Sequence, residues 1–399
     1  MPTGDPAPAD GALSRSAPSR LTRIPFGIYV HVPYCSARCG YCDFNTYTSA
    51  ELGAQPGASQ SDYLLAIRKE LDLAVRVLGK TPKVSTIYFG GGTPTLLPAG
   101  EQAAVVDAIR QRFPVAKNAE ITTEANPESV AELGLDILAM AGFNRISLGM
   151  QSAVPKVLEV LERRHSPGRV EQVVGWARSA GFKSVSLDLI YGAPGESLDD
   201  WRTSLETALA LRPDHVSAYS LTLEPGTRLA ARVDRGELIG VDEDFQADCY
   251  LLADSLLSAA GLPAYEISNW AKRGQESRHN LGYWRSSNWW GIGPGAHSHV
   301  GGTRWWNVRH PRDYTSLVFA GKSPAQAREV LDDKQRRVER VMLGLRLAEG
   351  LQSSGLTADE QRRIGEYERR GLVSRLDERL SLTPAGRLLA DAIIREVLD

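Results

Sequence analysis

The sequence predicts an α/β fold: a partial (βα)6 barrel of the TIM type, followed by a smaller helical, winged-helix-like C-terminal domain. The first observation behind this prediction is an alternation, in which six short apolar runs are each followed by a turn and a helical pattern. The second is that the unusual cysteines and glycines fall just after these runs. Strands that alternate with helices form parallel sheets with right-handed crossovers, and barrels of this kind carry their chemistry on the loops after the strands.

The elements of the barrel follow one another in a regular order. The predicted strands are rich in β-branched and aromatic residues, which favour extended backbone, and they cover residues 27–32, 84–89, 120–124, 145–149, 184–190 and 215–221. The stretches between them place apolar residues at helical spacing. They predict helices over residues 62–78, 101–112, 129–141 and 198–211.

The predicted barrel covers residues 24–260, and the segments on either side of it differ from it in composition. Residues 1–23 are rich in Pro, Ala, Gly and Ser and lack the apolar core of a signal peptide, so we expect a disordered tail. Residues 261–330 open with six of the eight tryptophans and the run GIGPGAHSH, and we expect a connecting segment. So many aromatic residues suit either a flat or large ligand or a tryptophan-rich core junction.

Residues 331–399 are charged and helical, with a hairpin pattern at 372–382 and a last helix that begins at Thr383. Helices with a hairpin are typical of a winged-helix-like module. Such modules bind DNA or pack against a neighbouring domain. Because the chain has no strong basic excess, we favour packing.

Charge and hydropathy exclude several function classes. The 399 residues carry a net charge of −2, which gives no general attraction to nucleic acid or to an anionic membrane. No apolar run approaches the ~18 residues that span a bilayer. Three of the four cysteines are spaced too tightly for a disulfide framework, which indicates a reducing compartment, and we expect a cytoplasmic protein. The fourth, Cys249, fits helix packing.

The most informative motif is the triplet Cys35, Cys39 and Cys42, with C-x3-C-x2-C spacing. Three thiolates without a nearby fourth suit an iron–sulfur cluster that leaves one iron open to a ligand. Zinc with His31 as its fourth ligand is the alternative, but zinc sites favour paired C-x2-C spacings. One unit later, residues 90–95 read GGGTPT, where bare backbone lets a small ligand lie close. This is not a phosphate loop, because it lacks the Gly-Lys-Ser/Thr ending.

Taken in order, these motifs resemble radical S-adenosylmethionine enzymes, and within them the oxygen-independent coproporphyrinogen III oxidase group. The resemblance runs from about residue 25 to the C-terminus. Besides the cysteines and GGGTPT, it rests on LGMQS at 148–152, LDLIYGAP at 187–194, YSLTLEPG at 219–226, YEISN at 265–269 and HNLGYW at 279–284.

The resemblance implies a [4Fe–4S] cluster on Cys35, Cys39 and Cys42, with S-adenosylmethionine on the open iron. Carboxylates can accept bonds from ribose or amino groups, an arginine can pair with the carboxylate, and a tyrosine can pack on adenine. The residues that match the cofactor contacts of the family are Tyr29, Tyr41, Gly91, Gly92, Thr93, Glu124, Gln151, Arg163 and Asp188.

One position separates the chain from the oxidases. They carry a further cysteine two residues after the third, and here that residue is Phe44. The Cys-Asp-Phe ending and the HNLGYW motif instead resemble heme chaperones of the HemW type. Heme requires an axial ligand and an aromatic pocket, for which His279, Tyr283 and Trp284 are the candidates, with His297 and His299 in reserve. The alternative role of His279 and Asn280 is to brace the domain junction by hydrogen bonds.

The implied function is a heme chaperone that binds heme and transfers it to acceptor proteins, respiratory enzymes among them. The alternative is an oxygen-independent coproporphyrinogen III dehydrogenase, which performs radical oxidative decarboxylation in porphyrin metabolism. We expect the chain to lack that activity because of Phe44. We expect no nucleic-acid partner. A peripheral membrane contact and a homodimer remain compatible with the chain, although no lipidation motif or basic amphipathic helix is evident.

Overall fold

The computed structural model describes residues 4–15, 17, 24–53, 56–163 and 166–399. Six neighbouring parallel strands form its centre, which confirms the predicted partial barrel. They lie close to the predicted ranges, except that the third begins earlier. They are β2 (Phe26–Val32), β3 (Val84–Gly91), β4 (Val115–Ala125), β5 (Arg145–Gln151), β6 (Ser184–Tyr191) and β7 (His215–Ser220).

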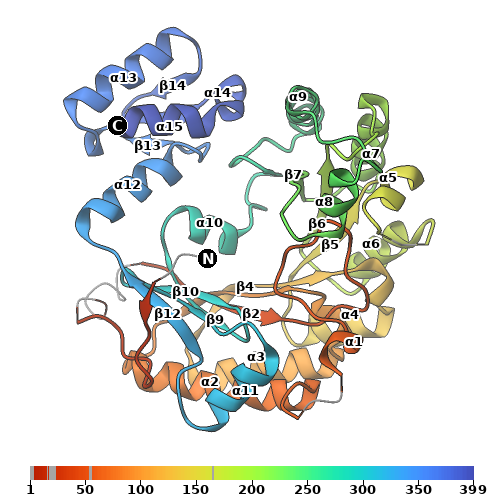
Figure 1. Ribbon diagram of the computed structural model, residues 1–399, viewed down its shortest axis with the longest axis vertical. Coiled ribbons are helices and arrows are strands. Elements are labelled where there is room, and N and C mark those ends of the chain that lie inside the picture. The colour runs from red at the N-terminus through yellow and green to blue at the C-terminus, as the bar shows by residue number, and fades with distance from the viewer. Residues whose placement is uncertain (1–3, 16, 18–23, 54–55, 164–165) are drawn as a thin grey trace.

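Helices cover the outer face of these strands (Figure 1). Each forms because its apolar residues recur at helical spacing, as in α2, where Tyr63, Ile67 and Leu71 are fully buried. Some helix starts are capped by a side chain: Ser197 accepts a hydrogen bond from the Asp200 amide and opens α7. The barrel helices are α1 (Ser49–Leu52), α2 (Gln60–Leu78), α3 (Ala99–Arg112), α4 (Glu132–Met140), α5 (Pro155–Val160), α6 (Arg169–Ser179), α7 (Leu198–Ala210), α8 (Arg228–Asp234) and α9 (Glu243–Ala259).

The sequence predicts that residues 261–330 connect two domains. In the structure they instead extend the barrel sheet. In this segment, β9 pairs in parallel with β2, and β10, β11 and β12 continue the sheet as antiparallel neighbours. Among the described residues the sheet therefore has 12 strands, and β1 (Asp5–Pro6) lies at one edge: the order is β1-β12-β11-β10-β9-β2-β3-β4-β5-β6-β7-β8. The added elements are β8 (Asn269–Ala271), α10 (Arg278–Trp284), β9 (Asn288–Ile292), β10 (His297–Val300), β11 (Thr303–Asn307), α11 (Pro311–Phe319) and β12 (Ala325–Val330).

Most tryptophans of this segment serve the core rather than a ligand. Trp270, Trp290, Trp305 and Trp306 are buried, and the rings of Trp290 and Trp305 pack edge to face with centroids 4.8 Å apart. Of the two interpretations of the tryptophans, the core junction is therefore correct for these four residues. Trp289 differs, because it lines a cavity described below.

The expectation of a disordered tail over residues 1–23 is wrong for the part that the structure describes. Strand β1 (Asp5–Pro6) pairs with β12, and the Ser323 amide donates to the Ala9 carbonyl at 2.7 Å. This segment is ordered because its backbone pairs with the edge strand β12. The amino-acid composition of the segment does not reveal such pairing. The rest of that expectation falls on residues outside the described ones.

The C-terminal module has its own apolar core, built around Val341, Leu345, Ile364 and Leu380. The predicted hairpin is present, and a third short strand completes a sheet in the order β13-β15-β14. In Figure 1, α10 lies between the module and the sheet. The module also contacts barrel helix α9, because Arg387 donates to the Tyr250 hydroxyl and to Asp254, each at 3.0 Å. Its elements are α12 (Asp333–Gly344), β13 (Leu351–Gln352), α13 (Ala358–Arg369), β14 (Val373–Leu376), β15 (Arg379–Leu382), α14 (Pro384–Leu388) and α15 (Ala390–Leu398). Among the described residues, no helix is long and apolar enough to cross a membrane.

Candidate functional site

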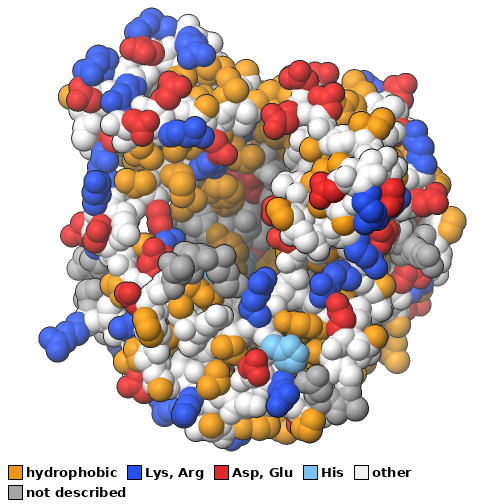
Figure 2. Space-filling model, viewed as in Figure 1, with side chains coloured by type: hydrophobic (Ala, Val, Ile, Leu, Met, Phe, Trp, Pro, Cys, Tyr) orange, Lys and Arg blue, Asp and Glu red, His pale blue; other side chains and the backbone are white. Residues whose placement is uncertain are grey.

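A cavity of about 990 Å³ lies at the carboxyl ends of the barrel strands. Figure 2 shows the surface hollowed between the C-terminal module and the opposite barrel helices, with hydrophobic side chains along the edge. The cavity brings together nearly all the residues singled out from the sequence. It is lined by Cys35, Cys39, Cys42, Tyr29, Tyr41, Gly91, Gly92, Thr93, Glu124, Gln151, Arg163, Asp188, His279 and Tyr283, whereas Trp284 is not among its lining residues.

The three cysteines lie on the loop between β2 and α1. The two ends of the loop are bonded to each other, because the Cys35 amide donates to the Tyr47 carbonyl at 3.0 Å and the Tyr47 amide donates to the Pro33 carbonyl at 2.7 Å. Within the loop, the Cys42 amide donates to the Cys39 carbonyl at 3.3 Å. All three thiols are half-buried and free. Burial raises the pKa of the Cys35 and Cys42 thiols, so a bound metal must supply the positive charge that stabilises the thiolates.

The donor set fits a cluster better than a single zinc ion. A single zinc ion would need a fourth protein ligand besides the three thiols, whereas a cluster leaves one iron open. His31 is also unsuited to be the fourth ligand. Its Nδ1 bonds the Tyr29 hydroxyl at 3.0 Å and its Nε2 bonds the Asn45 carbonyl at 2.9 Å. A carbonyl only accepts, so Nε2 carries the proton and neither nitrogen is free for a metal.

The glycine run after β3 is required by its packing. A Cβ on Gly91 would stand 2.5 Å from the His31 ring, and one on Gly92 would stand 2.5 Å from the Tyr34 carbonyl oxygen. Gly91 also has φ of +110°, which favours glycine. Next to it, the Thr93 hydroxyl lies 3.8 Å from Cys35 Sγ. The glycines thus let the strand end lie against the cysteine loop.

Two half-buried carboxylates line the cavity. Glu124 accepts from the Tyr88 hydroxyl at 2.7 Å and from the Gly91 amide at 3.2 Å. Asp188 accepts from the Ser147 and Ser217 hydroxyls at 2.9 and 2.8 Å. Burial raises the pKa of Glu124 to about 7 and also raises that of Asp188. Both side chains are held rigidly and offer acceptor oxygens to a polar ligand.

Arg163 joins the cysteine loop to the end of β5. Its Nη2 donates to the Gly149 carbonyl at 3.1 Å, its Nη1 lies 3.6 Å from Cys39 Sγ, and its buried Nε has no partner. Gln151, at the end of the same strand, has φ of +65°, an uncommon conformation that turns the chain into the cavity wall. An arginine with a spare donor beside a thiol suits a carboxylate ligand near the cluster.

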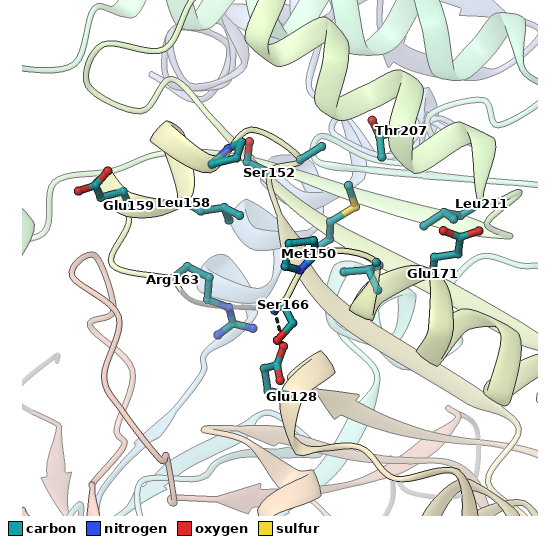
Figure 3. A pocket seen from close by; sticks show the side chains of 15 residues that line it. Glu128, Met150, Ser152, Leu158, Glu159, Arg163, Ser166, Glu171, Thr207 and Leu211 are labelled. Atoms are coloured by element: carbon teal, nitrogen blue, oxygen red, sulfur yellow. Dashed lines mark hydrogen bonds between the residues drawn. The ribbon is translucent and has the colours of Figure 1, made fainter.

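A second cavity of about 910 Å³ lies beside the first and shares Arg163 with it (Figure 3). The Ser166 amide donates to Glu128 at 2.5 Å, and in Figure 3 Arg163 lies to the left of this bond. Leu211 lies on the opposite side of the view. The space is lined by helix residues and by the outward-facing Met150 of β5. It lies outside the group of residues singled out from the sequence, apart from Arg163.

His279, on α10, is anchored on every side. Its amide donates to Glu120 at 3.0 Å, its Nδ1 lies 2.8 Å from the Thr86 hydroxyl, and its Nε2 lies 2.8 Å from the Tyr283 hydroxyl. Its ring stacks on Tyr88, with centroids 5.1 Å apart. Burial lowers its pKa to about 3, so the imidazole is neutral. The bonds show that His279 does brace α10 against the barrel.

The aromatic side chains beyond His279 form a continuous wall. The rings of Tyr283 and Trp289 lie 4.7 Å apart, and the Trp289 indole donates to the His297 carbonyl at 2.9 Å. Of the two reserve histidines, His297 lines the cavity. His299 is not among the lining residues and bonds the Ser287 carbonyl through Nδ1 at 2.8 Å.

The sequence interpretation gave no role to His215, which lies in a buried network on the cavity floor together with Asn280, one of the two residues proposed as a brace. His215 bonds Ser186 through Nδ1 at 2.8 Å and the Tyr265 hydroxyl through Nε2 at 2.9 Å. Asn280 then donates to Tyr265 at 3.2 Å and to Glu266 at 2.9 Å. Polar residues two apart within apolar strands, such as His215 and Ser217, were the available signal, because alternate strand residues share a face.

Comparisons with known proteins agree with this geometry. The radical SAM superfamily model matches residues 29–208, and the HemN C-terminal domain model matches residues 331–389. The fold is similar to that of coproporphyrinogen III oxidase (HemN) from Escherichia coli, a radical SAM enzyme, with a TM-score of 0.81 over 96% of this chain and 92% of that one, at 23% identity.

Relatives share the full length. The heme chaperone HemW of Mycobacterium tuberculosis is 50% identical over 96% of this chain and 99% of its own. The heme chaperone HemW of Bacillus subtilis is 34% identical over 92% of this chain and 97% of its own. The chain therefore belongs to the HemW family, within the radical SAM superfamily.

Proposed function

We propose that this protein is a heme chaperone, which binds heme and transfers it to acceptor proteins, and that it carries a [4Fe–4S] cluster and exchangeable S-adenosylmethionine. The observation that carries the proposal is a single cavity with two different walls. One wall holds the three thiols and the polar residues beside them, and the other holds a buried neutral histidine and aromatic rings. The names of the full-length relatives support the same function.

The cluster would be held by Cys35, Cys39 and Cys42, which leave one iron for the amino and carboxylate groups of S-adenosylmethionine. In this superfamily the bound pair supplies an electron transfer that cleaves the sulfonium. We propose that Arg163 pairs with the carboxylate and that Tyr41 packs on the adenine. The other proposed contacts are Tyr29, Gly91, Gly92, Thr93, Glu124, Gln151 and Asp188, all of which line the cavity.

Heme would bind through His279, beside Tyr283 and Trp284. A neutral imidazole is the form that ligates iron, and Thr86 on Nδ1 would orient the ring, as such outer partners do for metal ligands. Because Nε2 bonds the Tyr283 hydroxyl, ligation exchanges that bond for iron. Trp284 is half-buried and is not among the lining residues of the cavity, so the proposed contact with the porphyrin rests on His279 and Tyr283.

Phe44 argues against the alternative, decarboxylation of coproporphyrinogen III. It occupies the position of the further oxidase cysteine and lies on the cavity wall with 64% of its surface exposed. An exposed aromatic ring there can contact a porphyrin but cannot replace a thiol. We further propose that the protein is cytoplasmic and supplies heme to respiratory enzymes.

The test is anaerobic reconstitution followed by parallel assays. We expect the reconstituted protein to bind hemin with a spectral shift and to form no decarboxylated porphyrinogen when S-adenosylmethionine and a reductant are added. His279→Ala should lose the shift. His310→Asn is the matched control, because it removes an imidazole outside the cavity lining and keeps a side chain that can cap α11. Absence of hemin binding, or turnover of coproporphyrinogen III, would overturn the proposal.

A further inference from the structure

The arginines that line the cavity differ in whether their guanidinium groups have partners within the protein. Four arginines line it, and the guanidinium groups of three are bound within the protein. Their partners are Glu51 for Arg38 at 3.3 Å, the Ser184 hydroxyl for Arg145 at 2.8 Å and the Gly149 carbonyl for Arg163 at 3.1 Å. The fourth, Arg309, is the exception.

Arg309 follows β11 and is exposed on the cavity wall. Its carbonyl accepts a hydrogen bond from Asn45 Nδ2 at 2.9 Å, so its backbone is fixed against the cysteine loop. Its guanidinium makes no hydrogen bond or ion pair with any residue in the part of the chain that the structure describes. The guanidinium of Arg309 therefore presents an unpaired positive charge to the cavity, and the backbone position of Arg309 does not depend on that side chain.

The free charge lies at the outer end of the aromatic wall. The ring of His279 lies 5.0 Å from that of Tyr283, which lies 4.7 Å from that of Trp289, and Trp289 bonds the His297 carbonyl. Burial, with a smaller contribution from the charge of Arg309, lowers the pKa of His297. The Gly295 amide donates to the Val308 carbonyl at 2.8 Å, and the Asn307 amide donates to the Ala296 carbonyl at 2.9 Å. The backbone that leads to Arg309 therefore lies against the segment that leads to His297, and the wall runs from a buried imidazole, across aromatic rings, to an exposed guanidinium.

Resting on the proposed function, we infer that Arg309 recognises the carboxylate groups of heme and so fixes the orientation in which the porphyrin enters. Heme carries iron at its centre, an apolar ring around it and two carboxylates on one edge. The wall offers the complementary chemistry in the same order. A guanidinium is the side chain best suited to a carboxylate, because its planar donors can bind both oxygens. The carboxylates then face the exposed end of the cavity.

The test compares hemin with hemin dimethyl ester, in which the carboxylates are masked. We expect the reconstituted wild-type protein to bind hemin about tenfold more tightly than the ester, as one charge-assisted pair would give. Arg309→Ala should weaken hemin binding about tenfold and leave the ester unchanged. Arg309→Lys, which keeps the charge without the fork of donors, should fall between the two.

Arg312→Ala is the matched control, because Arg312 is also exposed and lies three residues further on, outside the cavity lining. It should bind both ligands like the wild type. Equal wild-type affinity for hemin and ester, or equal weakening of both by Arg309→Ala, would overturn the role of Arg309 while leaving heme binding intact. A wild-type protein that binds neither ligand would instead overturn the proposed function.

Discussion

At the scale of single residues, the environment of His279 decides what its imidazole can do. The tyrosine at the fourth position after it could be anticipated, because residues four apart share a helix face, and Tyr283 does bond Nε2. Thr86 and Glu120 could not be anticipated. They come from β3 and β4, and only the folded sheet brings them to α10. Gly27 completes the arrangement, since a Cβ there would stand 3.1 Å from the ring.

This environment predicts the effect of replacing the Thr86 hydroxyl. Thr86→Val keeps the shape but leaves Nδ1 of His279 buried and unpartnered, which should lower the free energy of unfolding by about 1–3 kcal/mol. Hemin binding should weaken roughly tenfold, because outer partners orient metal ligands. Denaturant unfolding and hemin titration measure the two effects. Thr86→Ser, which keeps the hydroxyl, should resemble the wild type. Unchanged hemin affinity in Thr86→Val would mean that this bond does not orient the ring.

At the scale of elements, the six barrel strands and the terminal hairpin were predictable, but the strands of residues 261–330 were not. The barrel strands are apolar runs separated by amphipathic helices, which is a strong pattern. Strands β9 and β11 are only five residues long and each has two adjacent tryptophans, so their alternation is hidden. The clash that a Cβ on Gly291 would make, 2.1 Å from the His297 carbonyl oxygen, explains the composition: here glycines mark close backbone approach.

The contact between this extension and the cysteine loop leads to a second prediction. Asn45 donates to the Pro294 carbonyl at 3.0 Å and to the Arg309 carbonyl at 2.9 Å, so one amide ties the loop to both. Asn45→Asp keeps the size but replaces the donor with an acceptor that faces two carbonyl oxygens. We expect the reconstituted cluster to lose iron to a ferrous chelator several times faster.

The control for this experiment is Asp43→Asn, which makes the reverse exchange on an exposed neighbour in the same loop. It should release iron at the wild-type rate. If Asn45→Asp also released iron at that rate, the loop would be held by its own backbone bonds rather than by the sheet extension.

At the scale of the whole molecule, a buried carboxylate joins the first long helix to the last strands of the barrel sheet. Glu70 of α2 accepts from the Gly293 amide at 2.9 Å, from Asn307 Nδ2 at 2.8 Å and from the Tyr314 hydroxyl at 2.5 Å. It could not be distinguished in the sequence, because a glutamate in an amphipathic helix is usually exposed. Only the extension of the sheet beyond β2 buries it.

The third prediction concerns the pH dependence of stability. Burial raises the pKa of Glu70 from 4.5 to about 7. Above pH 4.5 the unfolded chain releases this proton while the folded protein keeps it, so the contribution of Glu70 to stability falls until the pH passes about 7. The free energy of unfolding of the wild type, minus that of Glu70→Gln, should therefore drop by roughly 2–3 kcal/mol between acidic and mildly alkaline pH. Denaturant titrations at pH values on both sides of this range measure it, and the subtraction cancels the other titrating groups. A difference that stays constant with pH would show that the hydrogen bonds from Gly293, Asn307 and Tyr314 keep Glu70 ionised despite its burial.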